Sequence, residues 1–177
     1  MRKNLYISLL LLLISYSNIY SQNSDLKISN EYKRIENLKT LKIDSLCLKR
    51  GVDFSRGSIA DKKIYKIFKK DKRIIKIEYE ERNEGYRKWK KKITIYLKND
   101  IPFLIIEKDN GTTTLYTSEG EKAEPYKNFV EIYIYNWNKE EFKRLNNGYI
   151  AIPQMKICKV CYEELIEKVK SEIKNKK

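Results

Sequence analysis

The residues of this chain best suited to chemistry are two cysteines near its C-terminal end. Cys158 and Cys161 stand three positions apart in the segment ICKVCYEEL, residues 157–165. This spacing occurs in redox-active dithiols, in zinc sites and in structural disulfides. The third cysteine is Cys47, so an oxidising compartment would allow one bridge and one leftover thiol. The open pairings are Cys158–Cys161, Cys47–Cys158 and Cys47–Cys161.

Two roles compete for these cysteines. A redox role places the first cysteine at the start of a helix, where the helix dipole stabilises a thiolate. We expect the helix to begin at Pro153, which puts Cys158 beyond its first turn. A bridge from Cys47 would close a loop of about 110 residues and stabilise the fold by about 4–5 kcal/mol. A structural disulfide is therefore the main expectation, and a periplasmic thiol-disulfide protein is the alternative function.

The sequence contains no histidine, which excludes several kinds of catalysis. Ser-His-Asp and Cys-His mechanisms cannot form, nor can zinc or copper sites with histidine ligands. Three thiolates fall short of the four Cys or His ligands of a usual structural zinc site. The sequence has no glycine-rich phosphate loop, GxSxG or SxxK motif. We expect a protein that is not an enzyme and has no cofactor and no metal.

The first residues have the order of a secretory signal peptide. Arg2 and Lys3 precede an apolar run at 5–14, which is shorter than the roughly 20 residues of a membrane span. Cleavage after Ser17 or Ser21 fits the small polar residues that follow. We expect residues 1–21 to be a signal peptide and 22–177 one domain, exported to the periplasm or secreted, with no membrane span in the mature chain. An uncleaved N-terminal anchor is the alternative.

The chain is strongly basic, with 38 Lys and Arg against 24 Asp and Glu and a formal net charge of +14. Such a charge on an exported protein suggests polyanion binding, because lysines attract anionic groups. The excess is spread along the chain and is mostly lysine, which also keeps proteins soluble. Polyanion binding is therefore a second alternative. The expected partner is an envelope protein or an acidic glycan, and nucleic acid is not expected.

Two stretches are candidate binding surfaces. Period-two alternation in FVEIYIYNW (129–137) puts aromatic side chains on one face and aliphatic ones on the other, although cross-strand packing is the commoner role for such residues. This candidate binding face consists of Tyr133, Tyr135 and Trp137. The second candidate is a basic patch around Trp89, which would otherwise be a solvated strand start. It consists of Arg87, Lys88, Lys90 and Lys92.

The elements that position these residues are short strands separated by turns. The β-rich runs are 62–69, 73–81, 86–98, 102–108, 112–117, 129–137 and 140–145. Turn signals lie at 70–72, 82–85, 99–101, 109–111, 118–121 and 146–148, and Asn110-Gly111 is the strongest of them. The links are too short for parallel crossovers, so the pattern predicts an antiparallel meander.

Both ends of the mature chain show helical spacing. We expect a helix at 30–49 ended by Gly51, although residues 41–49 also alternate like a strand. A C-terminal helix would carry an inward stripe of Cys158, Cys161, Leu165, Val169 and Ile173. The expected fold is α+β, an antiparallel β-meander sheet of six or seven strands with an N-terminal and a C-terminal helix.

In two long stretches, aromatic-rich alternating runs are followed by turn residues. These stretches are ITIYLKNDIPFLIIEKDNG (93–111) and VEIYIYNWNKEEFKRLNNG (130–148). This pattern, over residues 62–148, resembles the uncharacterised secreted bacterial proteins built from repeated hairpins. The resemblance implies an exported, single-domain, non-catalytic architecture and supplies no site residues. With the rest of the sequence it predicts an exported binding or envelope-associated module.

Overall fold

The structure is a computed structural model and describes residues 23–49, 60–83, 88–148 and 157–176. The chain divides into two units, Met1–Leu38 and Lys39–Lys177. The described part of the first unit contains a helix at 23–36, in which Arg34 pairs with Glu31 at 2.8 Å. The second unit contains the sheet and the C-terminal helix. The expected signal peptide and its cleavage sites lie outside the described residues.

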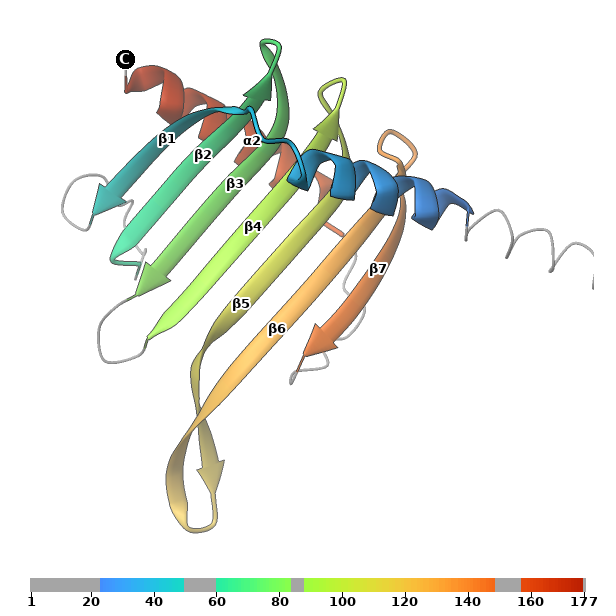
Figure 1. The fold of residues 1–177 in the computed structure, drawn as a ribbon. Coiled ribbons are helices and arrows are strands. Elements are labelled where there is room, and N and C mark those ends of the chain that lie inside the picture. The colour runs from blue at the N-terminus through green and yellow to red at the C-terminus, as the bar shows by residue number, and fades with distance from the viewer. Residues whose placement is uncertain (1–22, 50–59, 84–87, 149–156, 177) are drawn as a thin grey trace, which may run out of the picture. The chain divides into compact units, whose positions relative to one another are not determined.

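The second unit is built on a seven-stranded antiparallel sheet whose strands follow the order of the chain (Figure 1). The strands are β1 (Lys42–Lys49), β2 (Lys62–Lys70), β3 (Arg73–Asn83), β4 (Trp89–Lys98), β5 (Ile101–Thr117), β6 (Gly120–Asn136) and β7 (Glu141–Gly148). The C-terminal helix is α2 (Lys159–Asn175). The predicted α+β meander with a helix at each end is therefore confirmed.

Two of the predicted turns have the backbone of tight hairpins. Asp71 and Lys72 join β2 to β3 with φ of 50° and 68°, and Asn99 and Asp100 join β4 to β5 with φ of 52° and 63°. Two successive positive φ angles are typical of the type I′ turn, whose twist matches that of the strands it joins. The consequence is a sheet in which neighbours in sequence are neighbours in space.

The expected helix at 30–49 is wrong in its second half. The helix ends at residue 36, and Lys42–Lys49 form strand β1. Leu46 pairs with Tyr65 of β2, and both Leu46 and Leu48 pack against the core. Residues 41–49 also alternate like a strand in the sequence. They form a strand because an edge strand needs apolar side chains on only one face.

The strongest turn signal is also wrong, because Asn110-Gly111 lies inside β5. Gly111 pairs with Trp89 of β4 and with Tyr126 of β6. A Cβ atom on Gly111 would lie 2.8 Å from Trp89 Cβ and 3.0 Å from both the Lys88 carbonyl oxygen and Tyr126 Cε1. The glycine is thus a point of close approach within a strand rather than a turn. Residues 146–148, another turn signal, likewise belong to β7.

One face of the sheet packs against α2 to form the core. Buried aliphatic and aromatic residues of β2 to β6 cluster with Tyr162, Ile166, Val169 and Ile173 of the helix. The helix runs behind the sheet in Figure 1, from Glu107 of β5 near its start to β1 at its end, where Lys176 Nζ donates to the Ser45 carbonyl oxygen at 2.6 Å. Burying this stripe holds the helix in place.

The inward stripe of α2 differs from the predicted one. Val169 and Ile173 are buried as expected, but Cys158 and Cys161 are exposed and Leu165 is half-buried. Tyr162 and Ile166 occupy the inward positions instead. The large aromatic ring and the branched aliphatic side chain bury more apolar area than two sulfurs would, which sets the rotation of the helix.

Candidate functional site

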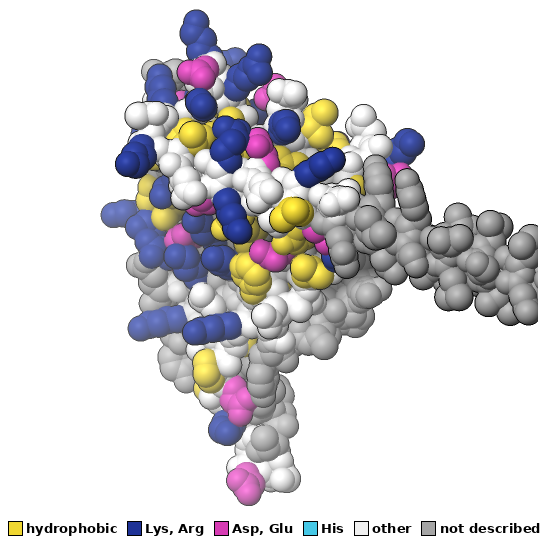
Figure 2. Space-filling model, turned by 45° about the vertical axis from the view of Figure 1, so that its right-hand side comes forward, with side chains coloured by type: hydrophobic (Ala, Val, Ile, Leu, Met, Phe, Trp, Pro, Cys, Tyr) yellow, Lys and Arg dark blue, Asp and Glu magenta, His cyan; other side chains and the backbone are white. Residues whose placement is uncertain are grey.

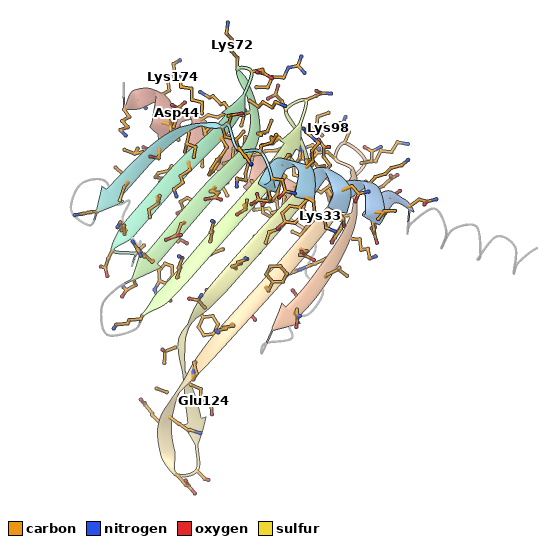
Figure 3. The ribbon with its side chains drawn as sticks, in the orientation of Figure 1. Lys33, Asp44, Lys72, Lys98, Glu124 and Lys174 are labelled. Atoms are coloured by element: carbon orange, nitrogen blue, oxygen red, sulfur yellow. A yellow bond between two sulfur atoms is a disulfide. The ribbon has the colours of Figure 1, made fainter. Side chains whose placement is uncertain are left out.

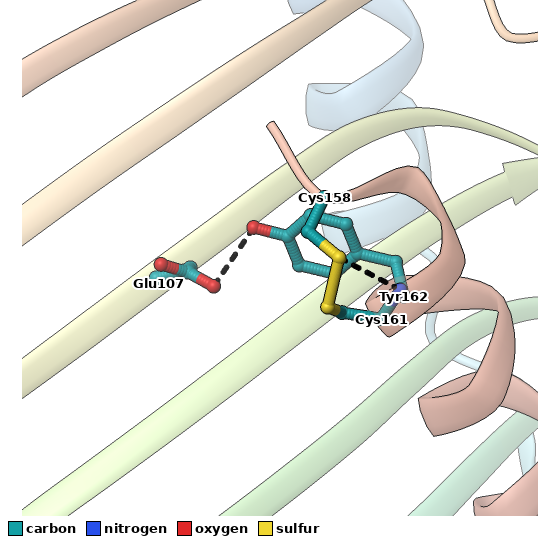
Figure 4. The surroundings of a disulfide bond; sticks show 4 residues. All are labelled: Glu107, Cys158, Cys161 and Tyr162. Carbon is teal, nitrogen blue, oxygen red and sulfur yellow. Dashed lines mark hydrogen bonds between the residues drawn. A yellow bond between two sulfur atoms is a disulfide. The ribbon is translucent and has the colours of Figure 1, made fainter. Parts of the chain in front are cut away.

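The three cysteines form one disulfide, between Cys158 and Cys161, with a Cα–Cα distance of 5.3 Å (Figure 4). Of the three open pairings this one forms and neither bridge from Cys47 does, so Cys47 is a free, exposed thiol. Its neighbours Leu46 and Leu48 turn toward the core, so Cys47 between them faces away from α2.

The disulfide lies at the start of α2. Cys158 is the cap residue before Lys159, and its Sγ accepts a hydrogen bond from the backbone N–H of Cys161 at 3.3 Å. The expected start at Pro153 lies outside the described residues. Cys158 thus lies at the start of the helix and not beyond its first turn, so the helix dipole can stabilise a thiolate at this position.

A cavity of about 370 Å³ adjoins the disulfide. Besides the two cysteines, its wall includes Lys91, Glu107 and Arg144 together with aliphatic side chains of β4, β6 and α2. The Tyr162 hydroxyl donates to Glu107 Oε1 at 2.9 Å, as Figure 4 shows. Burial raises the pKa of Tyr162, and the negative charge of Glu107 raises it further. The cavity wall is thus apolar with two cations and one carboxylate.

The aromatic row is divided between the two faces of the sheet. The pairing of β6 with β7 shifts between Ile134 and Asn136, which leaves Tyr135 as an extra residue with 37% of its surface exposed. A bulge of this kind interrupts the alternation of faces. Trp137 is consequently buried in the core, where its Nε1 donates to Glu163 of α2 at 3.1 Å. Tyr133, Tyr135 and Trp137 do not form one surface.

The residues of the predicted basic patch lie in two places. Lys88 and Lys90 line a groove at the end of the sheet where β4 begins. Lys92 lies one row further along β4, and its Nζ is 3.0 Å from Glu78 Oε2. Arg87 lies outside the described residues.

This groove, called the basic groove below, has a volume of about 650 Å³ and lies over the end of β3, the start of β4 and the middle of β5 and β6. The cross-strand register assembles it, because Arg82, Lys90, Asn110 and Lys127 are successive partners on β3, β4, β5 and β6. The lining residues are Arg82, Asn83, Lys88, Trp89, Lys90, Asn110, Gly111, Thr112, Pro125, Tyr126 and Lys127. They include four cations and no carboxylate.

The positive charge of the basic groove is only partly neutralised. Glu80 approaches Lys90 Nζ at 3.1 Å and Arg82 Nε at 3.9 Å, so one carboxylate serves two cations. Lys88 and Lys127 are both exposed. Neither has an ion pair within the ranges that the structure covers. Figure 2 shows the same imbalance more widely, with dark blue Lys and Arg side chains more abundant than magenta Asp and Glu ones.

Two aromatic side chains border Gly111 on the face of the sheet that packs against α2, opposite to the face of Lys90 and Lys127. Trp89 and Tyr126 are its partners on the adjacent strands, and each is half-buried. The Tyr126 hydroxyl donates to Asp109 Oδ1 at 3.0 Å. Burial raises the pKa of Tyr126 to about 12, and the charge of Asp109 contributes. Tyr126 is therefore neutral at physiological pH and held in one orientation.

Sequence reasoning missed half of the cations of the basic groove. Arg82 and Lys127 are 45 positions apart in the sequence and meet only through the register of four strands. Gly111 between two aromatic partners was the available signal, because a glycine inside an alternating run marks a place of close backbone approach.

Neither a metal centre nor a membrane helix can be assigned in the described ranges. No cluster of three or more His, Cys, Asp or Glu residues there could hold a metal ion. None of the helices described is both long and apolar enough to cross a membrane.

No family model, curated protein or solved structure matches this chain.

Proposed function

We propose that this chain is an exported binding module, without catalytic activity, that holds an acidic glycan in the basic groove. The observation that carries the proposal is the lining of that groove, which has four cations and no carboxylate. Its volume of about 650 Å³ lies within the range of about 300–1,000 Å³ that is common for ligand sites.

The charges are arranged to follow an extended anionic chain. Arg82, Lys90 and Lys127 lie on one cross-strand row, and Lys90 and Lys127 are two strands apart, which corresponds to about 10 Å. Lys88 begins the next row. A linear polyanion laid across β3 to β6 would therefore meet several cations in succession, and each contact would release bound counterions.

The expected export favours a glycan over nucleic acid. A protein directed by a signal peptide meets acidic glycans at the cell envelope or outside the cell. Polyanion binding, which the sequence offers as a second alternative function, is thus the mode of binding that we propose for the exported module.

The test is the affinity of the mature chain for heparin, used as a sulfated glycan, measured across a range of salt concentrations. Replacing Lys88 and Lys127 by Gln removes two exposed cations from the basic groove. We expect the affinity to fall and the slope of log affinity against log salt to decrease by about 2, roughly one for each lysine.

The matched control replaces Lys98 and Lys139 by Gln. Both are exposed; Lys98 ends β4 and Lys139 lies in the turn between β6 and β7, and neither lines the basic groove. Figure 3 shows Lys98 at the end of the sheet opposite the hairpin that carries Glu124. The control has the same net charge as the K88Q/K127Q variant. Equal losses of affinity in the two variants would show that heparin binds through unspecific charge, and would refute the basic groove as the binding site. Equal binding of single-stranded DNA and heparin would refute the choice of a glycan.

A further inference from the structure

The disulfide at the start of α2 is not part of the basic groove and has the geometry of an exchangeable bond. Both cysteines are exposed, so a thiol from solution can reach them. Exposed disulfides are the ones most often labile, regulatory or catalytic. Cys158 caps the helix, and the N–H of Cys161 points at its sulfur at 3.3 Å.

A purely structural role would contribute little to this fold. A bridge between residues three apart closes a short loop, for which the chain-entropy model gives less than half of the stabilisation of a bridge from Cys47. The helix is already anchored by Tyr162, Ile166, Val169 and Ile173. Reduction should therefore leave α2 packed on the sheet.

The surroundings favour the reduced form with an anionic sulfur. The N-terminus of α2 and the Cys161 N–H both stabilise a thiolate on Cys158. Lys91 and Arg144 add positive charge on the wall of the adjoining cavity, against one carboxylate, Glu107. A disulfide whose reduced form is stabilised is a stronger oxidant.

We propose that the Cys158–Cys161 disulfide oxidises pairs of cysteine thiols in other polypeptides. The cavity of about 370 Å³ next to the sulfurs, with its aliphatic wall, receives the apolar side chain beside the attacking cysteine. This activity is independent of the basic groove and of any ligand bound there.

The exchange takes place in two steps. A thiolate of the substrate attacks Cys158 Sγ, the Cys158–Cys161 bond breaks, and its electron pair leaves on Cys161. A second substrate thiolate then attacks the substrate sulfur of this mixed disulfide, and Cys158 leaves as a thiolate stabilised by the helix N-terminus. The two substrate thiols lose two electrons and two protons, and Cys158 and Cys161 gain them. A small-molecule disulfide restores the starting state by the reverse reaction.

The experiment uses the mature chain and a reduced peptide that contains two cysteines, with acid quenching, alkylation and mass spectrometry. We expect the wild type to oxidise one equivalent of peptide, with the circular dichroism spectrum unchanged on reduction. Cys161→Ser cannot form the bridge; with Cys158 first converted to a mixed disulfide with glutathione, this variant should release glutathione and hold a single-cysteine peptide on Cys158. Cys47→Ser is the matched control and should behave as the wild type.

Two results would overturn the proposal. One is a disulfide that resists millimolar reduced glutathione until the protein unfolds. The other is a folded Cys161→Ser variant whose Cys158–glutathione disulfide does not exchange glutathione for the peptide. Retained peptide oxidation by Cys158→Ser would also contradict the assignment of Cys158 as the attacked sulfur. Loss of oxidation in Cys47→Ser would contradict the assignment of the activity to the Cys158–Cys161 pair alone.

Discussion

At the scale of single residues, the contact between Tyr162 and Glu107 fixes the start of α2 on the sheet. The hydroxyl and the carboxylate oxygen are 2.9 Å apart, and Tyr162 is 9% exposed. Hydrogen bonds to charged groups contribute about 1.5–3 kcal/mol when their partners are withdrawn from water. The contact therefore joins the helix turn that carries the disulfide to β5.

Replacing Tyr162 by Phe tests this contact. We expect the free energy of unfolding to fall by about 1.5–3 kcal/mol, because Glu107 loses its donor in a half-buried site. The measurement is equilibrium denaturation with urea. The double variant Y162F/E107L removes both partners and should recover part of the loss. A fall below about 0.5 kcal/mol for Y162F alone would show that the hydrogen bond does not anchor the helix.

The raised pKa of Tyr126 predicts a pH dependence of stability. The folded-state pKa is about 12 and the ordinary value is 10.0, so the fold favours the protonated phenol. Its contribution is fully present below pH 10 and is lost as the pH rises through about 12. The stability difference between wild type and Tyr126→Phe should therefore be constant below pH 10 and then decrease. A difference that stays constant up to pH 12 would refute the role of Asp109 and burial at this site.

Several residues show why the site could be predicted only in part. Lys88 and Lys90 are visible as a local basic cluster, and both line the basic groove. Arg82 and Lys127 join them through strand pairing, which local sequence does not encode. Trp137 shows the reverse case, because one bulge at Tyr135 turns it from the predicted face to the core.

At the scale of elements, β5 shows how one glycine connects two hairpins. The sequence signal of Asn110-Gly111 predicts a turn, but the two segments beside it form one strand of 17 residues. Trp89 and Tyr126 on the adjacent strands pack where a side chain at position 111 would lie. The hairpin turn lies instead at Ser118 and Glu119, between the paired residues Thr117 and Gly120 and within the turn predicted at 118–121.

Gly111→Ala is expected to destabilise the fold. An alanine normally stabilises a glycine position by about 0.4–1 kcal/mol through the unfolded chain. Here its Cβ would lie 2.8 Å from Trp89 Cβ and 3.0 Å from a backbone oxygen, and overpacking costs about 1–3 kcal/mol. Thermal and urea denaturation give the sign of the change in the free energy of unfolding. The same substitution in a Trp89→Gly background should cost less, and a net gain in the wild-type background would contradict the close packing.

The terminal elements show a further limit of sequence periodicity. Residues 42–49 fit both helical and strand spacing, and pairing with β2 selects the strand. In α2 the predicted and observed stripes differ at the start, because packing of Tyr162 and Ile166 rotates the cysteines outward. The type and order of the elements follow from local residue patterns, whereas the rotation of the helix depends on the sheet that it covers.

At the scale of the whole molecule, the second unit groups paired charges on the face of the sheet opposite to α2. The face under α2 holds the core cluster, which includes Ile95 and Ile105 of the sheet and Val169 of the helix, whose exposed fractions are all 0%. The opposite face holds rows of paired charges, such as Lys92 with Glu78 and Lys90 with Glu80, and also the buried side chains of Leu104 and Ile106. Lys88 and Lys127 of the basic groove are exposed and belong to neither buried set, so substituting them can alter binding without unfolding the sheet.

The central claim is that the row of Arg82, Lys90, Asn110 and Lys127 binds an acidic glycan. The most direct measurement is the change in backbone amide NMR shifts when a sulfated heparin hexasaccharide is added to the mature chain. We predict that the largest changes fall on this row and on Lys88 and Trp89, and that they disappear in K88Q/K127Q. Changes spread evenly over exposed lysines such as Lys98 and Lys139, or the absence of binding at low salt, would contradict the account.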